Sequence, residues 1–461
     1  MRGARWVRAG GVALGLLALV PLACAGREAH RAASAAEPAR SAALESSALE
    51  AVPSARWGRA LALGSDGGVR AAVTPDGDVL VAATYAEPLD LGTGALPFRA
   101  GATGPHLLLA RYGAGGELRW ARGWAPQGEG AQPVQVGGLA VDASGDILLG
   151  GSAGTGLSLD GLAVAPGTFV ARLGPDGRAR WVRPLAREGR VHLAALALGA
   201  GGEVVAVGDF TGALQLADGT RAEAREAHGA FVLRLAGGGE VVWGRAFAPG
   251  AGLARARAVA VDPFGAVYVA GDYAGVVSFG DSTFVAVGDR TPFALKLDAS
   301  GRHVWSRELA GAHGTAFALA LGVDRVFVTG SYEGRFFFRG QWNASDWQDA
   351  FLVAYSDAGE ERWSRSFGAA GTALATDGAG QVTLAGVGDA GERPQLFVAR
   401  FLPDGGAQLG AQSFPGPGTG ERGPSASALA LAADGGAVLA GTVSRAGVGA
   451  ARDGFLLRLQ P

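Results

Sequence analysis

The sequence is poor in several residue types, and each shortage excludes a class of structure. Cys24 is the only cysteine among the 461 residues, so no disulfide within the chain contributes to its stability. Lys296 is the only lysine, whereas arginine is abundant. The formal net charge of −2 argues against general nucleic-acid binding. No window of the repeated part shows a sustained helical period of apolar residues, which argues against helices there.

Motifs that carry chemistry are also missing. The six histidines show no metal-ligand spacing, and no glycine-rich stretch is followed by Lys-Ser or Lys-Thr as in a phosphate loop. Aspartates occur in the stretches 76–78 and 142–146, but the further acidic ligands of a calcium loop are absent, so we interpret both as tight turns. The sequence therefore predicts no catalytic residues, no metal and no cofactor.

What the chain does contain is glycine, 78 residues of it, and a repeated unit that is clearest at 258–309. Short runs rich in β-branched and aromatic residues alternate there with turns of Asp, Gly, Pro and Ser, a pattern typical of antiparallel strands. The four runs of the unit are residues 258–261, 267–270, 293–297 and 303–305.

The unit recurs along almost the whole chain. The second and third runs each occur seven times, from 78–85 to 437–443 and from 108–112 to 455–459. A tryptophan marks the fourth run at intervals of 58 to 63 residues, and Leu409 stands in the same place in the last copy. These tryptophans are Trp57, Trp120, Trp181, Trp243, Trp305 and Trp363.

The two ends of the repeated part predict how it closes. It begins with a fourth run, residues 56–61, and the first, second and third runs that would precede it are missing. The last unit contains only the first three runs. The N-terminal strand can therefore complete the last sheet. We predict an all-β fold, a seven-bladed β-propeller of four-stranded blades that is closed by the N-terminal strand.

Two repeated residue types need an interpretation. We interpret the tryptophans as packing wedges between blades, because a large aromatic residue dominates local burial. The third run carries a basic residue in six of its seven copies, with Ala354 as the exception. It either forms a ring of cations for an anionic ligand or, as we favour, reaches the rim and pairs with a nearby carboxylate.

The first 24 residues have the pattern of an export signal. Arg2, Arg5 and Arg8 precede an apolar run, 9–23, that is too short to span a bilayer comfortably. Cys24 follows it and resembles the lipidation site of bacterial lipoproteins, although Pro21 stands where that family prefers leucine. Lipidation at Cys24 is our prediction. Plain secretion after cleavage and a retained anchor are the alternatives.

Residues 25–53 contain mostly Ala, Ser, Glu and Arg and cannot bury much apolar surface. We predict a flexible linker there, with a weak helix as the alternative. Residues 54–461 then form one propeller domain, which we expect to be a monomer.

The most unusual departure from the repeat is the insertion 335–349 in the fifth unit. We predict a partner-binding segment, because Trp and Arg are favoured at interfaces. The alternative is a hairpin whose aromatic residues cover the edge of the blade. The predicted contact residues are Arg335, Phe336, Phe338, Trp342, Asp346 and Trp347.

Two family resemblances follow from the unit at 267–305, whose sequence reads VYVAGDY, then FALKLDASGRHVW. It resembles bacterial seven-bladed (SBBP-type) β-propeller repeats, which are common in secreted proteins. The segment 297–305 is also similar to quinoprotein-type repeats. That second resemblance implies a quinone cofactor or a noncatalytic outer-membrane assembly lipoprotein, but no cofactor-binding residue can be matched.

These patterns together predict a noncatalytic cell-envelope propeller that presents loops to a protein or glycan partner. It would be exported and held in the outer membrane by a lipid at Cys24, or else be periplasmic or secreted. The alternatives are a quinoprotein-like or polysaccharide-acting enzyme and a purely structural envelope protein.

Overall fold

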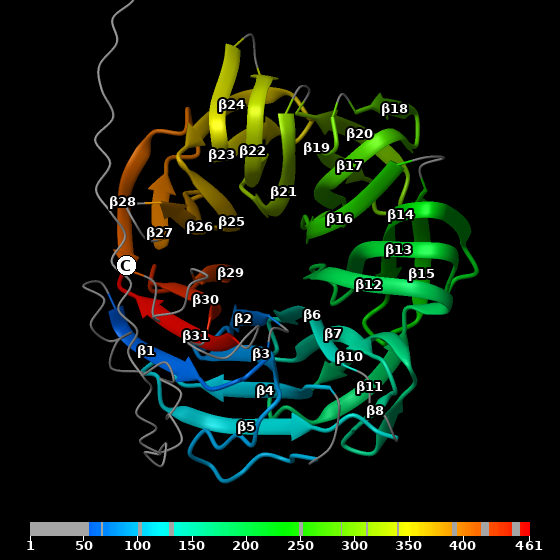
Figure 1. The fold of residues 1–461 in the computed structure, drawn as a ribbon, viewed down its shortest axis with the longest axis vertical. Helices are drawn as coiled ribbons and strands as arrows, with labels where there is room; N and C mark the ends of the chain where they lie inside the picture. Colours follow the sequence, from blue (N-terminus) through cyan, green and yellow to red (C-terminus); the bar gives the residue numbers. More distant parts are fainter. Residues whose placement is uncertain are drawn as a thin grey trace, which may run out of the picture. The chain divides into compact units, whose positions relative to one another are not determined.

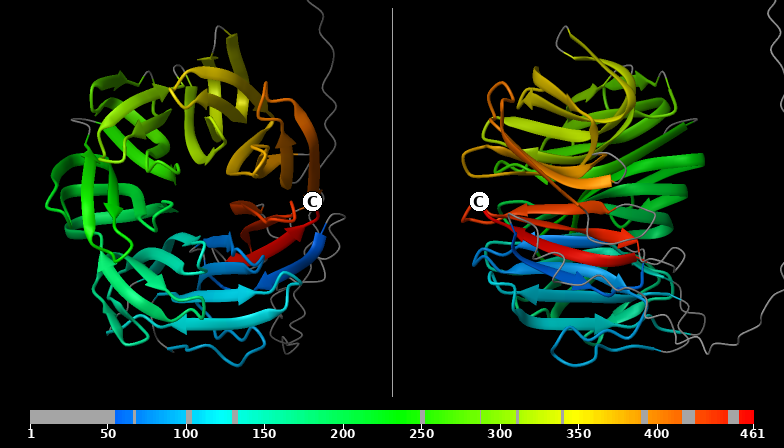
Figure 2. Two further views of the ribbon diagram at one scale, coloured as in Figure 1. Left: turned by 180° about the vertical axis from the view of Figure 1, so that it is seen from behind. Right: turned by 60° about the vertical axis from the view of Figure 1, so that its left-hand side comes forward.

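The computed structural model consists of strands joined by turns and loops, and the described residues contain no helix. Seven sheets stand side by side around a common axis (Figures 1 and 2). The structure describes residues 55–65, 68–99, 104–128, 133–248, 252–286, 288–309, 312–338, 341–389, 394–415, 424–444 and 452–461. The predicted signal 1–24 and linker 25–53 lie outside these ranges.

The sheets follow one another along the chain, and in each the first strand lies nearest the axis (Figure 1). Blade 1 contains β2 (Val69–Val73), β3 (Val79–Tyr85), β4 (His106–Tyr112) and β5 (Leu118–Trp124). Blade 2 contains β6 (Val134–Val141), β7 (Ile147–Ala153), β10 (Gly167–Leu173) and β11 (Ala179–Pro184). Blade 3 contains β12 (Ala186–Leu198), β13 (Val204–Leu216), β14 (Arg221–Leu235) and β15 (Val241–Phe247).

The remaining blades repeat this order. Blade 4 contains β16 (Gly252–Val261), β17 (Val267–Phe279), β19 (Thr291–Leu297) and β20 (His303–Glu308). Blade 5 contains β21 (Ala312–Leu321), β22 (Arg325–Phe338), β23 (Gln341–Ser356) and β24 (Glu361–Phe367). Blade 6 contains β25 (Ala369–Thr376), β26 (Val382–Asp389), β27 (Pro394–Phe401) and β28 (Gln408–Pro415).

The seventh blade confirms the predicted closure. It contains β29 (Ser425–Leu431), β30 (Ala437–Ser444) and β31 (Arg452–Leu459), and the N-terminal strand β1 (Ala55–Leu61) is its fourth strand. β1 pairs with β31 in antiparallel fashion, with Trp57 opposite Arg458. Because the first and last strands of the described chain are hydrogen-bonded neighbours, the ring is complete.

The antiparallel order gives the ring two distinct faces. Tight turns between first and second strands, and between third and fourth strands, lie on one face, which we call the lower face. Connections from second to third strands and links between blades lie on the other, the upper face. Insertions into the repeat therefore gather on the upper face, including the small hairpin β8 (Leu157–Leu159) and β9 (Leu162–Val164), and β18 (Ser282–Val285).

The hydrophobic core lies between the blades. Every residue of β3 is buried, since neighbouring blades cover both faces of a second strand. One core cluster joins Tyr268 and Trp305 of blade 4 to Phe336 and Tyr355 of blade 5. A single blade could not bury these side chains, so the blades stabilise each other around the ring.

The tryptophans pack between blades, where the repeat predicts them. Trp243 donates a hydrogen bond from Nε1 to the carbonyl of Ala299, in the β19–β20 turn of the next blade, at 2.9 Å. Arg245 donates to Gly301 of the same turn at 2.7 Å. Gly301 has a φ of +77°, and a Cβ there would lie 2.8 Å from the indole ring, so the turn needs glycine for both reasons.

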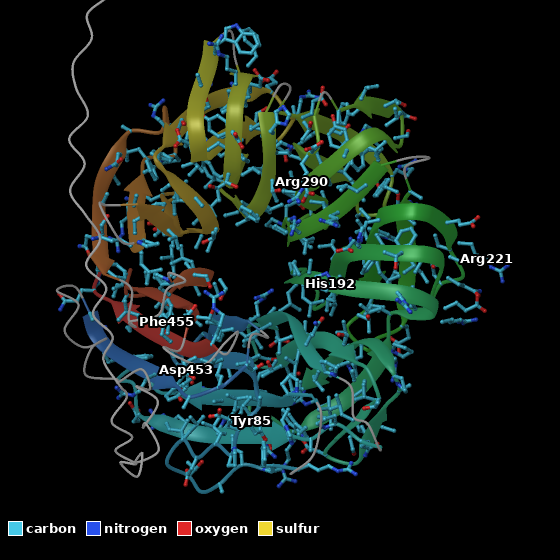
Figure 3. The ribbon with its side chains drawn as sticks, viewed as in Figure 1. Tyr85, His192, Arg221, Arg290, Asp453 and Phe455 are labelled. Carbon is cyan, nitrogen blue, oxygen red and sulfur yellow. The ribbon has the colours of Figure 1, made fainter. Side chains whose placement is uncertain are left out.

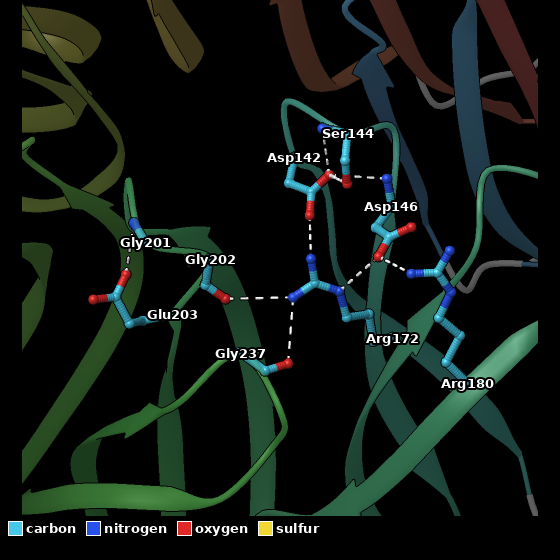
Figure 4. A network of polar contacts seen from close by, with 9 residues as sticks. All are labelled: Asp142, Ser144, Asp146, Arg172, Arg180, Gly201, Gly202, Glu203 and Gly237. Carbon is cyan, nitrogen blue, oxygen red and sulfur yellow. Dashed lines mark hydrogen bonds and ion pairs between the residues drawn. The ribbon is translucent and has the colours of Figure 1, made fainter.

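The basic residue of the third strand also joins neighbouring blades. Arg172 forms ion pairs with Asp142 and Asp146 of its own blade and donates to the carbonyl of Gly237 in the next blade at 3.3 Å (Figure 4). In most blades this cation thus pairs with carboxylates at the lower rim, as we favoured. Carbonyl groups of the next blade are partners that the sequence did not predict.

Blade 5, which has alanine at this place, supplies the cation from another strand. Arg325 of β22 pairs with Asp324 at 2.7 Å and donates to the carbonyl of Pro403 in the next blade at 2.7 Å. It lies near Ala354, because Phe327, two residues further along β22, is opposite Ala354 in the ladder. The contact between blades is therefore kept although the repeat is broken.

Candidate functional site

A large pocket lies on the upper face between blades 2 and 3. Its volume is about 750 Å³, within the usual range for ligand sites. Blade 2 contributes residues of β6, β7 and β10. Blade 3 contributes residues of β12, β13 and β14. The polar side chains that line it are Gln135, Ser152, Thr168, Arg187, Glu188, Arg190, His192, Asp209, Thr211 and His228.

The strands on the two sides of this pocket differ in length. In blade 2, β7 and β10 have 7 residues each, whereas β13 and β14 of blade 3 have 13 and 15. The insertion of blade 2 forms the β8–β9 hairpin, which reaches toward blade 1 through a bridge between Pro126 and Leu157. Phe210, Leu214 and Leu216 of the longer β13 are nonetheless buried, and the polar residues Asp209 and Thr211 alternate with them along the strand.

Two histidines that share one aspartate form the centre of the pocket. Asp209 lies on β13, and its two carboxylate oxygens are 3.2 Å from His192 Nδ1 and 2.8 Å from His228 Nδ1. His192 is on the neighbouring strand β12, on the side of the blade nearest the axis (Figure 3). The carboxylate is the acceptor, so each Nδ1 carries a proton and Nε2 remains for another contact.

The electrostatics of this cluster are consistent with an ionised carboxylate. Burial of Asp209 opposes ionisation, but the hydrogen bonds from His192 and His228 outweigh it and lower the pKa of Asp209 below its ordinary value. The Asp209 side chain is 14% exposed, while the side chains of His192 and His228 are 57% and 35% exposed. A buried anion thus orients two imidazoles that remain accessible to a ligand.

The next blade has an aspartate at the same repeat position with different partners. Asp272 occupies the equivalent repeat position in β17, follows a glycine as Asp209 does, and is fully buried. It forms an ion pair with Arg257, while its second carboxylate oxygen has no partner among the described residues. Asp272 alternates along β17 with residues that face blade 3, and its partner Arg257 lies over the ring of Phe317 in blade 5.

The structure separates the residues that the sequence predicted as partner-binding. Phe336 and Phe338 are buried in the core between blades 4 and 5, so this part of the prediction needs correction. They alternate with exposed residues along β22, and every second side chain of a strand faces the same side. Arg335 is exposed, and so is Trp342 at 67%.

The other predicted positions cannot be placed in the same way. Asp346 and Trp347 belong to β23 by their backbone, but their side chains lie outside the described residues. Cys24, the predicted lipidation site, also lies outside them. Phe337, which we did not predict, is 46% exposed, and its ring centroid lies 5.3 Å from that of Trp342. The β22–β23 hairpin therefore presents one aromatic pair to solvent.

Sequence reasoning missed the histidine cluster because no fixed spacing marks it. His192 and His228 are far apart along the chain, and the ladder brings them together by placing His192 opposite Asp209 and His228 opposite Thr211. The available signal was the Gly-Asp-aromatic sequence at 208–210 and 271–273, which occurs in these two blades only.

Two further negative findings concern the described residues only. They contain no group of three or more His, Cys, Asp or Glu that could hold a metal ion. A helix long and apolar enough to cross a membrane is not found among them either.

The fold defines the class of protein, a seven-bladed β-propeller. No family model matches the chain, and no curated protein matches it. Among solved structures, the chain is similar to the polysaccharide lyase Uly1, with 10% identity, 86% of this chain and 90% of that chain covered, and a TM-score of 0.46. It is also similar to a protein of unknown function from Dyadobacter fermentans, with 12% identity, 89% and 100% covered, and a TM-score of 0.42.

A third similar structure is the calcium-binding protein regucalcin from Agrobacterium tumefaciens. It has 13% identity, 71% of this chain and 91% of that chain covered, and a TM-score of 0.33. Identities this low leave function open, and the assignment of seven blades rests on the sheets described above.

Proposed function

We propose that this chain is a noncatalytic β-propeller of the bacterial cell envelope that binds a protein or glycan partner on its upper face. The observation that carries the proposal is the pocket around His192, Asp209 and His228. It lies between blades 2 and 3, and its two histidines present side chains that are 57% and 35% exposed. Rigid scaffolds with irregular loops are a common way to position binding residues.

The test is capture of envelope material by the full chain. We expect the wild-type protein to retain a glycan or an envelope protein, and the double variant His192→Gln, His228→Gln to lose it. His313→Gln is the matched control, because His313 is an exposed histidine on the inner strand of blade 5. Equal retention by all three proteins would show that the pocket does not bind the captured partner.

The exposed aromatic pair of blade 5 is a second candidate surface. Trp342→Ala tests it better than deletion of 335–349, because deletion would also remove the buried Phe336 and Phe338. Loss of a captured protein in Trp342→Ala, with unchanged thermal unfolding, would assign the protein partner to this hairpin. Retention of the same protein would assign it elsewhere.

A catalytic alternative would use the same imidazoles, because a carboxylate-oriented histidine is suited to proton transfer. Incubation of the captured glycan with the protein separates the two functions. We expect the chain length of the glycan to stay constant over hours. Progressive shortening that requires His192 would establish an enzyme instead.

The cellular address is part of the proposal. We propose export and lipidation at Cys24, which anchors the protein in the outer membrane. Metabolic labelling with a fatty acid should mark the protein, globomycin should block processing, and Cys24→Ala should abolish the label. Processing that is insensitive to globomycin, with no label, would indicate plain secretion.

A further inference from the structure

The charged groups around the histidines all come from blade 3. Arg187 and Arg190 lie on β12 with Glu188, Asp209 lies on β13, and the blade 2 side of the pocket contributes no charged residue among those described. Two guanidinium groups and two carboxylates give a formal charge of zero when both imidazoles are neutral. Protonation of the imidazoles makes the pocket cationic by up to two charges.

The imidazoles change their role when they are protonated. Asp209 already accepts the Nδ1–H of His192 and of His228. A neutral ring then offers a lone pair at Nε2, whereas a protonated ring offers a second N–H donor. Protonation of both rings therefore supplies two additional charge-assisted donors for an anion.

The rest of the lining argues against a protein partner in this pocket. It contains no Phe, Tyr, Trp, Leu, Ile or Met among the described residues, so the apolar anchor of a protein interface has no place to bind. Gln135, Ser152 and Thr211 instead provide an amide and hydroxyls. Such groups match the alternating donors and acceptors of sugar hydroxyls.

We infer that the pocket binds an acidic saccharide, whose carboxylate or sulfate group is held by His192 and His228 together with Arg187 and Arg190. This inference rests on the proposed binding function and names the ligand class of the same site. Asp209 positions the two imidazoles, and Gln135, Ser152 and Thr211 contact the neutral hydroxyls of the saccharide.

The experiment measures binding of the full chain to three oligosaccharides of equal length by calorimetry. Oligogalacturonate supplies carboxylates, a heparin oligosaccharide supplies sulfates, and a maltooligosaccharide is neutral. We expect one or both acidic probes to bind roughly tenfold more tightly at about pH 5.5 than at about pH 8, because the imidazoles gain donors. The acidic probe that binds identifies the group.

Variants test the assignment of residues. His192→Gln with His228→Gln should weaken binding roughly tenfold at about pH 5.5 and remove its pH dependence. Arg190→Gln should weaken binding at both pH values, since guanidinium stays charged. His313→Gln should bind like the wild type. Thermal unfolding of each variant confirms that the ring is intact.

The outcomes separate this inference from the function on which it rests. Equal binding of neutral and acidic probes, or pH-independent binding that ignores the histidines, overturns the acidic ligand while a glycan-binding propeller stands. Capture of an envelope protein with no binding of any saccharide also overturns it. If neither saccharides nor envelope proteins bind the full chain, the proposed function falls together with the inference.

Discussion

At the residue scale, the two equivalent aspartates of blades 3 and 4 show how the surroundings decide the role of a residue. Asp209 and Asp272 occupy the same repeat position. The first orients two accessible imidazoles and the second is buried against Arg257. The repeat sequence does not distinguish them, because their partners stand on neighbouring strands, His192 and His228 for Asp209 and Arg257 for Asp272.

This contrast predicts different effects of the same substitution. Asp272→Asn should lower the free energy of unfolding by about 2 kcal/mol, because it removes the charge that neutralises Arg257. Asp209→Asn should lower it by less than about 1 kcal/mol, since its partners are partly exposed. Urea denaturation of both variants measures the difference. Equal losses would contradict the assignment of a packing role to Asp272 alone.

At the scale of the element, the fourth strands carry the contacts between blades. Six of them contain the sequence Trp-x-Arg. The indole N–H groups of Trp57, Trp243 and Trp363 donate to a carbonyl in the turn between the third and fourth strands of the next blade. The seventh place is held by Leu409, which is 50% exposed. The reason is topological: in the blade that follows it, β31 and β1 are joined by no hairpin turn on which an indole could pack.

The element scale gives a paired prediction. Trp243→Ala should cost about 3–5 kcal/mol of unfolding free energy, because a wedge between two blades is lost. Leu409→Ala should cost less than about 1 kcal/mol, because half of the side chain is exposed. Thermal unfolding measures both, and partner binding should be unchanged in either variant. A Trp243→Ala protein as stable as the wild type would refute the wedge.

The sequence predicted these elements well, because the number of blades and their closure follow from a count of repeated runs. The position of Trp57 in the repeat predicted that its strand pairs with the last strand, and Trp57 lies opposite Arg458 of β31. The pocket could not be predicted in this way. It depends on the side chains that stand beside Asp209 on β12 and β14, His192 and His228, and the repeat fixes no residue type at those places. The role of Arg325 was also missed, because it lies on the second strand of blade 5, whereas the repeat places the basic residue on the third strand, where blade 5 has Ala354.

At the scale of the whole molecule, ion pairs are distributed along the lower rim of the ring. Hydrogen bonds from Lys296 and Tyr268 lower the pKa of Asp357. Burial opposes ionisation of Asp142, but its hydrogen bonds with Ser144 and backbone groups, and the charge of Arg172, lower the pKa of Asp142 as well. The same direction holds for Asp76, Glu203 and Asp434.

These shifts predict the pH dependence of stability. A carboxyl group whose pKa is lower in the folded state stabilises that state above its unfolded pKa, and the contribution is lost as the pH falls through the folded pKa. We therefore expect the unfolding midpoint to be nearly constant around neutral pH and to fall below about pH 4. Asp142→Asn should reduce the slope. A midpoint that rises on acidification would contradict the ion-pair account.

The closing strand also fixes the face at which the upstream chain joins the ring. Ala55, at the start of β1, is opposite Leu459 at the lower end of β31, so the chain enters the ring on its lower face. The pocket between blades 2 and 3 opens on the opposite face. The segment upstream of Ala55 is therefore joined to the ring at the face opposite to the one that carries His192 and His228.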